Sequence, residues 1–198
     1  MQLSWFYSKP GTAIVDLAMD LDSHGKQFNL LGVAYREDGS VARRLGDTLK
    51  LDAGAPALYH YSHQFNLPPG RYRVRVTVGS GGEPFGSAEK TIEIAPWDGE
   101  MLSASGIALS VKDYALTGVT AGLDNSLLEG SRRLASKGRL IVPMGGAQLP
   151  TGQNGLFYFE VYEPRLTQAT AKQPTQPPLI RIRILDGTTG EGRRIPGR

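Results

Sequence analysis

The stretch that decides the fold is Leu67-Pro68-Pro69-Gly70-Arg71-Tyr72-Arg73-Val74-Arg75-Val76-Thr77-Val78. Its two prolines fix the backbone angle φ and end the strand before them, and Gly70 supplies the turn. Tyr72 and the valines after it alternate with arginine and threonine, which is typical of a strand with one buried face. The stretch therefore predicts a tight corner that leads into an antiparallel strand.

A second strand pattern lies near the N-terminus. In residues 12–22, Asp16, Asp20 and Asp22 share one parity, and apolar side chains occupy the other. Period-two alternation predicts a half-buried strand. We expect the three aspartates to form a solvated acidic face.

Further strand patterns fill the rest of residues 1–97. A tyrosine just after a Pro-Pro-Gly corner resembles the tyrosine corner of immunoglobulin-like sandwiches, in which the hydroxyl is bonded to nearby backbone. We therefore predict an antiparallel β-sandwich of the immunoglobulin/fibronectin III-like type over residues 1–97. The other strands expected there are residues 28–36, 41–45, 59–67 and 90–94.

Residues 98–198 predict a second β-rich module, so the whole chain is expected to be all-β. Residues 156–162 are apolar on both parities, which favours a central strand. Residues 126–129 match a helix capping box, and residues 165–178 have the composition of a mobile loop. No second Pro-Pro-Gly corner follows, so this module is expected to be incomplete and the chain to be a fragment. Its strands are expected at residues 102–111, 140–143, 156–162 and 179–185.

Composition excludes several classes of function. The 198 residues are 40% hydrophobic and 21% charged, which is typical of a folded protein. The net charge is +3, but lysine and arginine are spread along the chain, so nucleic acid is not expected as a partner. The lack of cysteine excludes disulfides and cysteine-based metal sites. No apolar stretch approaches the roughly 20 residues of a membrane span.

The order of these features resembles the region that follows the von Willebrand factor type A-like domain in a group of bacterial, predicted exported proteins. The matching residues are Leu67 to Tyr72, for an L-P-P-G-x-Y strand, and Phe157 to Pro164, for an F-x-V-Y-x-P type strand. Asp186-Gly187 and Thr189-Gly190-Glu191 follow them. The resemblance implies a non-catalytic, extracytoplasmic β module in a larger protein. The Asp-x-Ser-x-Ser metal pattern of the type A-like domain is absent from the sequence, so no functional residue is carried over.

Histidine and aspartate are the candidate metal ligands. His60 and His63 differ in parity and are expected on opposite faces, with His63 beside Tyr61 and Phe65 as a core histidine. His24 follows the acidic strand. Carboxylates about 7 Å apart along one strand do not converge well on an ion, so calcium at the acidic face is the less favoured alternative.

Arginine and glutamate supply the candidate charged surface. Arg71, Arg73 and Arg75 form an outward stripe, and Glu89 and Glu93 share the outward parity of the next strand. Cross-strand pairing of opposite charges explains both sets. An acidic partner bound by the arginines is the alternative.

The sequence contains no Gly-x-Ser-x-Gly, His-Glu-x-x-His or phosphate-loop motif. Glu160 and Glu163 are the nearest pair for glycosidase-type chemistry, which leaves no local signature, and we do not assign them as catalytic. Trp5, Phe6 and Tyr7 are expected to begin the first sandwich. Pairing of that strand with another chain is the alternative.

These observations predict a non-enzymatic β-sandwich interaction or spacer module. No catalytic residue, cofactor or metal is assigned. The partners expected are proteins, either neighbouring domains or other chains, and the sequence leaves open whether a small molecule is bound. An extracytoplasmic location follows only from the family resemblance. The alternative is a carbohydrate-active accessory or hydrolytic domain, whose sign would be exposed Tyr59, Tyr61 and Tyr158, or two facing carboxylates.

Overall fold

The computed structural model describes residues 1–22, 27–51, 57–80, 83–115, 134–136, 138–167, 179–181, 184–185, 188–189 and 192–193. The chain forms two compact units, Met1–Tyr162 and Glu163–Arg198. Apart from the four-residue helix α3, the regular elements described are strands, and every pair of neighbouring strands is antiparallel. The predicted all-β class is confirmed.

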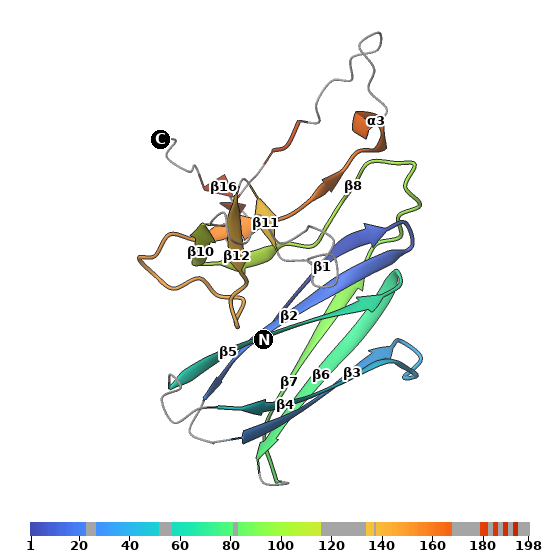
Figure 1. The fold of residues 1–198 in the computed structure, drawn as a ribbon. Coiled ribbons are helices and arrows are strands. Elements are labelled where there is room, and N and C mark those ends of the chain that lie inside the picture. The colour runs from blue at the N-terminus through green and yellow to red at the C-terminus, as the bar shows by residue number, and fades with distance from the viewer. Residues whose placement is uncertain are drawn as a thin grey trace. The chain divides into compact units, whose positions relative to one another are not determined.

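Seven strands of the first unit build a two-sheet sandwich (Figure 1). One sheet has the strand order β1-β2-β5, and the other has the order β4-β3-β6-β7. This is the immunoglobulin/fibronectin III-like arrangement that the sequence predicts. The strands are β1 Gln2–Lys9, β2 Thr12–Asp22, β3 Gln27–Arg36, β4 Val41–Lys50, β5 Leu58–Leu67, β6 Gly70–Ser80 and β7 Glu83–Ile94.

The two sheets meet in one apolar core. Val15 and Leu17 of β2 pack in the same cluster as Phe28 of β3 and Val74 and Val76 of β6, and all five are almost inaccessible to solvent. Each large apolar side chain buried in this way stabilises the fold by roughly 1.5–3 kcal/mol. The alternating positions that the sequence marked as apolar are therefore the ones that hold the sheets together.

The corner before β6 has the hydrogen bond that its sequence predicts. The Tyr72 hydroxyl donates to the Pro68 carbonyl at 2.9 Å, and the Tyr72 side chain is buried. Gly70 has a φ of +148°, and a Cβ atom there would lie 3.2 Å from the Tyr72 hydroxyl oxygen. Glycine is therefore required where the backbone turns and passes close to the ring.

The described residues between 98 and 162 form short strands that belong to the same compact unit as the sandwich. The predicted single strand at residues 156–162 is wrong. It is broken at Glu160, whose backbone N–H donates to the Ser105 hydroxyl at 2.8 Å, and each half pairs with one strand among the described residues. The strands are β8 Ser103–Ala104, β9 Ala108–Ser110, β10 Lys112–Ala115, β11 Ala135–Ser136, β12 Arg139–Val142, β13 Leu156–Tyr158 and β14 Val161–Tyr162.

These strands form small sheets with the orders β10-β12-β11, β13-β9 and β14-β8. The last strand of the sandwich ends at Ile94, close to the expected boundary, yet the compact unit continues to Tyr162. The division into residues 1–97 and 98–198 stays a prediction. The expected helical turn at residues 126–129 lies outside the described residues.

The second unit contains the helix α3 (Pro164–Thr167) and the strands β15 (Ile184–Leu185) and β16 (Gly192–Arg193), which pair with each other. The expected loop at residues 165–178 therefore begins inside α3, and residues 168–178 lie outside the described part. Among the residues described, no helix has both the length and the apolar character to cross a membrane.

Replacing Tyr72 by phenylalanine tests the corner. The variant loses the bond to Pro68 and leaves a carbonyl without its donor, so we expect the free energy of unfolding to fall by about 1 kcal/mol. Urea denaturation measures this change. The matched control is Tyr114→Phe, whose ring is exposed, and equal midpoints for the two variants would show that the corner hydroxyl does not stabilise the fold.

Candidate functional site

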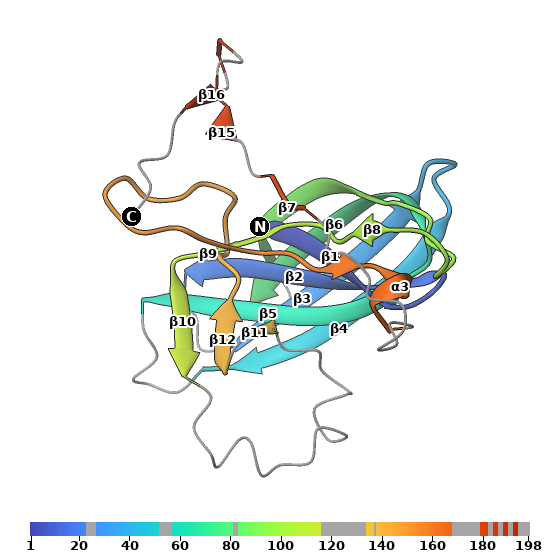
Figure 2. The same cartoon turned by 90° about the horizontal axis from the view of Figure 1, so that it is seen from above.

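The candidate site is the outer face of the sheet β1-β2-β5, the face turned away from the sandwich core. Figures 1 and 2 show β9, β10 and β12 lying across this sheet. Gln2, Ser4 and Phe6 of β1 and Asp16 and Ala18 of β2 point to the outer face by their parity, and all are buried. The described residues between 98 and 162 therefore cover a face that a simple sandwich leaves to solvent, and we call them the covering segment.

Gln2 fastens the covering segment to the sheet. Its Nε2 donates to the Leu109 carbonyl at 3.1 Å and to the Met144 carbonyl at 2.8 Å. Its Oε1 accepts from the Leu109 backbone N–H at 2.6 Å. The side chain is 3% exposed. We call this arrangement the Gln2 clamp, and it joins two segments more than 100 residues away in sequence to the first strand.

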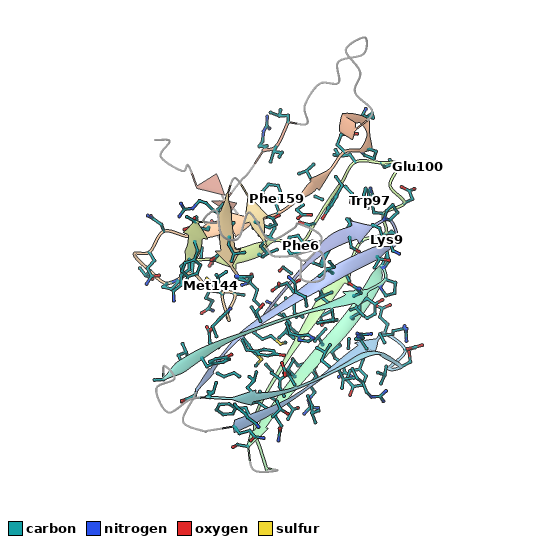
Figure 3. The ribbon with its side chains drawn as sticks, in the orientation of Figure 1. Phe6, Lys9, Trp97, Glu100, Met144 and Phe159 are labelled. Atoms are coloured by element: carbon teal, nitrogen blue, oxygen red, sulfur yellow. The ribbon has the colours of Figure 1, made fainter. Side chains whose placement is uncertain are left out.

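An apolar cluster lies beside the Gln2 clamp. Phe6 packs with Ala108 and Leu134, and the partly buried Ile141 and Tyr158 complete the group. The rings of Phe6 and Tyr158 meet edge to face with their centroids 5.4 Å apart. Figure 3 shows Phe6 and Met144 between the sandwich and the covering strands. Aromatic pairs of this geometry contribute about 0.5–1.5 kcal/mol beyond the area that they bury.

The free edge of β1 is also occupied by the covering segment. The Trp5 carbonyl accepts from the Gly106 N–H at 2.9 Å, and the Tyr7 N–H donates to the Tyr162 hydroxyl at 2.8 Å. Trp5 and Tyr7 lie in the sandwich core, so the expectation that the N-terminal aromatic residues begin the first sandwich is confirmed. The strand β1, which could have paired with another chain, is thus covered by residues of its own chain.

Asp16 is a buried carboxyl group in the middle of the outer face, with 3% of its surface exposed. Its Oδ2 accepts from Gln64 Nε2 at 2.7 Å. Neither Asp16 Oδ1 nor the nearby Ser4 hydroxyl has a hydrogen-bond partner among the described residues. Burial raises the pKa of Asp16, although the bond from Gln64 and the two histidines of β5 oppose the increase.

The prediction of a solvated acidic face is wrong at Asp16. Local alternation predicts only that the aspartates point away from the core, and residues 98–162 then bury this face. Asp22 lies at the exposed end of β2, and His24 lies outside the described residues. Among the residues described, no three histidine or carboxylate groups lie close enough together to hold a metal ion.

Asp20 and His60 face each other at one end of the outer face. His60 Nδ1 lies 2.8 Å from Asp20 Oδ1. They line a cavity of about 370 Å³, together with Lys112, Tyr114 and an apolar wall. Gly145 packs so closely on Asp20 that a Cβ atom there would lie 2.3 Å from the carboxyl carbon. This is the place on the outer face where polar side chains meet an open volume.

The apolar wall of the cavity is formed by Leu58, Val111, Val142, Pro143, Met144 and Pro150.

His60 and His63 point to opposite faces, as their parity predicts. His60 is paired with Asp20 on the outer face, and His63 is stacked between the rings of Tyr61 and Phe65, with centroid distances of 6.2 and 6.5 Å. His63 shares the core-facing parity of Tyr61 and Phe65, but it is only half-buried and lies outside the core cluster, so the prediction of a core histidine is confirmed in direction alone.

The arginine stripe is held largely by neighbouring side chains. Arg73 lies 3.6 Å from Glu89 and 5.2 Å from the centre of the Tyr35 ring, and Arg71 lies 3.8 Å from Glu37. Glu93 is directly opposite Arg71 in the register. Cross-strand charge pairing is confirmed for Arg73 and Glu89, whereas the ion pair of Arg71 is with Glu37 in the turn between β3 and β4. Such exposed pairs contribute about 0–1 kcal/mol each.

The two glutamates suggested for glycosidase-type chemistry have structural partners. Glu160 accepts hydrogen bonds from the hydroxyls of Tyr158, at 2.8 Å, and Tyr162. Glu163 pairs with Arg165, and the hydrogen bond from that side chain lowers the pKa of Glu163 to about 2. Each carboxylate therefore fixes local structure within its own unit.

None of the three tyrosines whose exposure would indicate a carbohydrate-active domain is fully exposed. Tyr61 is buried in the core and donates to Asp47 Oδ2 at 3.1 Å, and burial together with this carboxylate raises its pKa. Tyr59 is half-buried against the sandwich core, and Tyr158 packs on Phe6. The exposed aromatic ring at the cavity is instead that of Tyr114.

Sequence reasoning missed Gln2 and Tyr114, and it placed Asp16 on a solvated face although that residue is buried. One signal was present for the covered face, because the run Trp5-Phe6-Tyr7 is apolar on both parities. Such a run indicates that both faces of a strand are covered. Gln2 has no comparable signal, because its partners are backbone groups far along the chain.

Comparisons with known proteins give limited matches. No family model and no curated protein matches the chain. It resembles a chain described as a beta-galactosidase from Bacteroides fragilis (14% identity, TM-score 0.41), over 46% of this chain and 15% of that one. A glycosyl hydrolase family 2 member from Bacteroides cellulosilyticus (13%, 0.41) is matched over 46% and 14%. A beta-glucuronidase from Bacteroides uniformis (15%, 0.41) is matched over 58% and 15%.

Replacing Asp16 by asparagine tests the buried carboxyl group. Burial raises the pKa of Asp16, so the folded state loses stability as the pH rises through that pKa. Below about pH 4 the Asp16 carboxyl group is protonated in both the folded and the unfolded chain. We therefore expect the variant to melt at a higher temperature than the unmodified chain at pH 7, with the difference vanishing toward pH 4. Thermal melts across this range measure it.

The control is Asp38→Asn. Hydrogen bonds from Ser40 lower the pKa of Asp38, so the charged carboxylate stabilises the folded state and its removal is expected to lower the melting temperature at pH 7. If the difference in melting temperature between Asp16→Asn and the unmodified chain does not change with pH, the raised pKa of Asp16 is contradicted.

Proposed function

We propose that this chain is a non-enzymatic β-sandwich module that serves as an interaction or spacer module in a larger, exported bacterial protein. The observation that supports the proposal is the Gln2 clamp on Leu109 and Met144. A spacer must hold its neighbours in a fixed geometry. Buried, directional hydrogen bonds between distant segments provide that stiffness, whereas a flexible linker does not.

The exported location and the relation to proteins with a von Willebrand factor type A-like domain are part of the same proposal. They are supported by the motifs at Leu67–Tyr72 and Phe157–Pro164. The first of these motifs forms the tyrosine corner described above.

Replacing Gln2 by alanine tests the stiffness that a spacer needs. The variant leaves the Leu109 N–H and the Met144 carbonyl without their bonds to Gln2, which costs about 1–3 kcal/mol, while the Leu109 carbonyl keeps the bond from the Met144 N–H. We expect limited proteolysis to cut within residues 98–162 faster than in the unmodified chain. The control is Gln153→Ala at an exposed turn. Equal cleavage rates in the two variants would mean that the clamp does not hold the covering segment.

A second candidate function is carbohydrate binding at the cavity of Asp20 and His60. The observation that favours it is Tyr114, which is 56% exposed and lines this cavity beside both polar groups. Binding sites of this size combine apolar walls with a few convergent polar groups. An exposed aromatic face would pack against a sugar ring.

Thermal melts with a set of soluble polysaccharides separate the two functions. A glycan held at about 100 times its dissociation constant would add near 2.7 kcal/mol of stability, a shift of several degrees. The spacer proposal predicts no shift with any of them. If a glycan raises the melting temperature, and Tyr114→Ala abolishes this shift while Tyr35→Ala retains it, the glycan binds at the cavity. That result would replace the spacer function.

A further inference from the structure

The four edges of the two sheets differ in how they are protected. The edge strands are β1 and β5 in one sheet and β4 and β7 in the other. An edge strand presents unpaired backbone N–H and C=O groups to any other strand. Proteins block such edges with charged side chains, prolines, bulges or covering segments.

Three of the edges carry such protection. The edge of β1 is covered through the bond from Gly106 to Trp5. The edge strand β4 carries the adjacent Arg43 and Arg44. The edge strand β7 contains Pro84 and four charged residues, and its register with β6 shifts at Val78/Gly79.

In the described part of the chain, the edge of β5 shows none of these features. Its ten residues, Leu-Tyr-His-Tyr-Ser-His-Gln-Phe-Asn-Leu, include no proline, aspartate, glutamate, lysine or arginine. Its register with β2 is continuous from Leu58 to Leu67, without a bulge. Among the described residues β5 pairs with β2 alone. A long, regular and uncharged edge is the kind that accepts another strand.

We propose that β5 pairs in antiparallel fashion with β5 of a second copy of the chain, which joins two three-stranded sheets into one six-stranded sheet. This inference rests on the proposed interaction role and names the partner. The pairing is isologous, because a twofold axis perpendicular to the sheet relates the two strands.

The side chains of β5 suit this partner. A twofold axis at His63 places Tyr61 opposite Phe65 of the second copy and Tyr59 opposite Leu67, so that core-facing residues stay on one face. Aromatic and apolar pairs in such positions are favourable cross-strand neighbours. The same operation on β4 would gather the Arg43 and Arg44 side chains of both copies at one edge, where like charges repel.

The test is the mass of the full 198-residue chain in solution, measured by light scattering over a concentration series. We expect a monomer–dimer equilibrium that Ser62→Lys weakens by about tenfold or more, because the exposed Ser62 lies next to the twofold axis and two ammonium groups would meet there. The matched control is Thr91→Lys, an exposed position on the edge strand β7. It is expected to leave the equilibrium unchanged.

A single cysteine gives a second measurement, because the chain has none of its own. We expect a short bifunctional thiol reagent to link Ser62→Cys chains into dimers and to link Thr91→Cys chains far less. A monomer at every concentration, equal weakening by the two lysine variants, or equal linking of the two cysteine variants would overturn the proposal. None of these outcomes affects the Gln2→Ala result, which depends on contacts within one chain.

Discussion

The sheet β1-β2-β5 has two faces to cover, and the structure depends on how both are buried. The inner face packs on the four-stranded sheet through apolar side chains. The outer face carries polar groups, and burying such a group without a hydrogen bond costs roughly 1–3 kcal/mol. Gln2 meets this requirement by bonding the backbone of Leu109 and Met144, and Asp16 meets part of it through Gln64. The covering segment is therefore held on the sandwich by directional bonds as well as by apolar contact.

This arrangement explains why residues that suggested chemistry have structural roles. Glu160 is held by two tyrosine hydroxyls beside the edge of β1, and Arg73 is held between Glu89 and Tyr35. Asp20 and His60 are the exception, because they pair with each other at the wall of a cavity. The two surfaces of the described residues that we propose for partners are that cavity and the uncharged edge of β5.

Much of the sandwich could be predicted from sequence because its signals are local. The alternation after Gly70 predicted β6, and the Pro-Pro-Gly corner predicted the bond from Tyr72 to Pro68. The covered outer face could not be predicted in this way. Alternation in residues 12–22 shows which side chains point away from the core, but a segment more than 80 residues later decides whether that side is solvated. The break of the last long strand at Glu160 has the same cause, because its partner Ser105 lies 55 residues earlier.

Native-state hydrogen exchange tests most directly whether the sandwich and its covering segment are one cooperative unit. The amide of Leu109 donates to Gln2, and the amide of Met144 donates to the Leu109 carbonyl at 2.8 Å. If the segment is held as described, both amides exchange only through global unfolding, with the same free energy as the core amides of Val15 and Val74. Exchange of Leu109 and Met144 through a lower-energy opening, while β2 and β6 stay protected, would contradict the account.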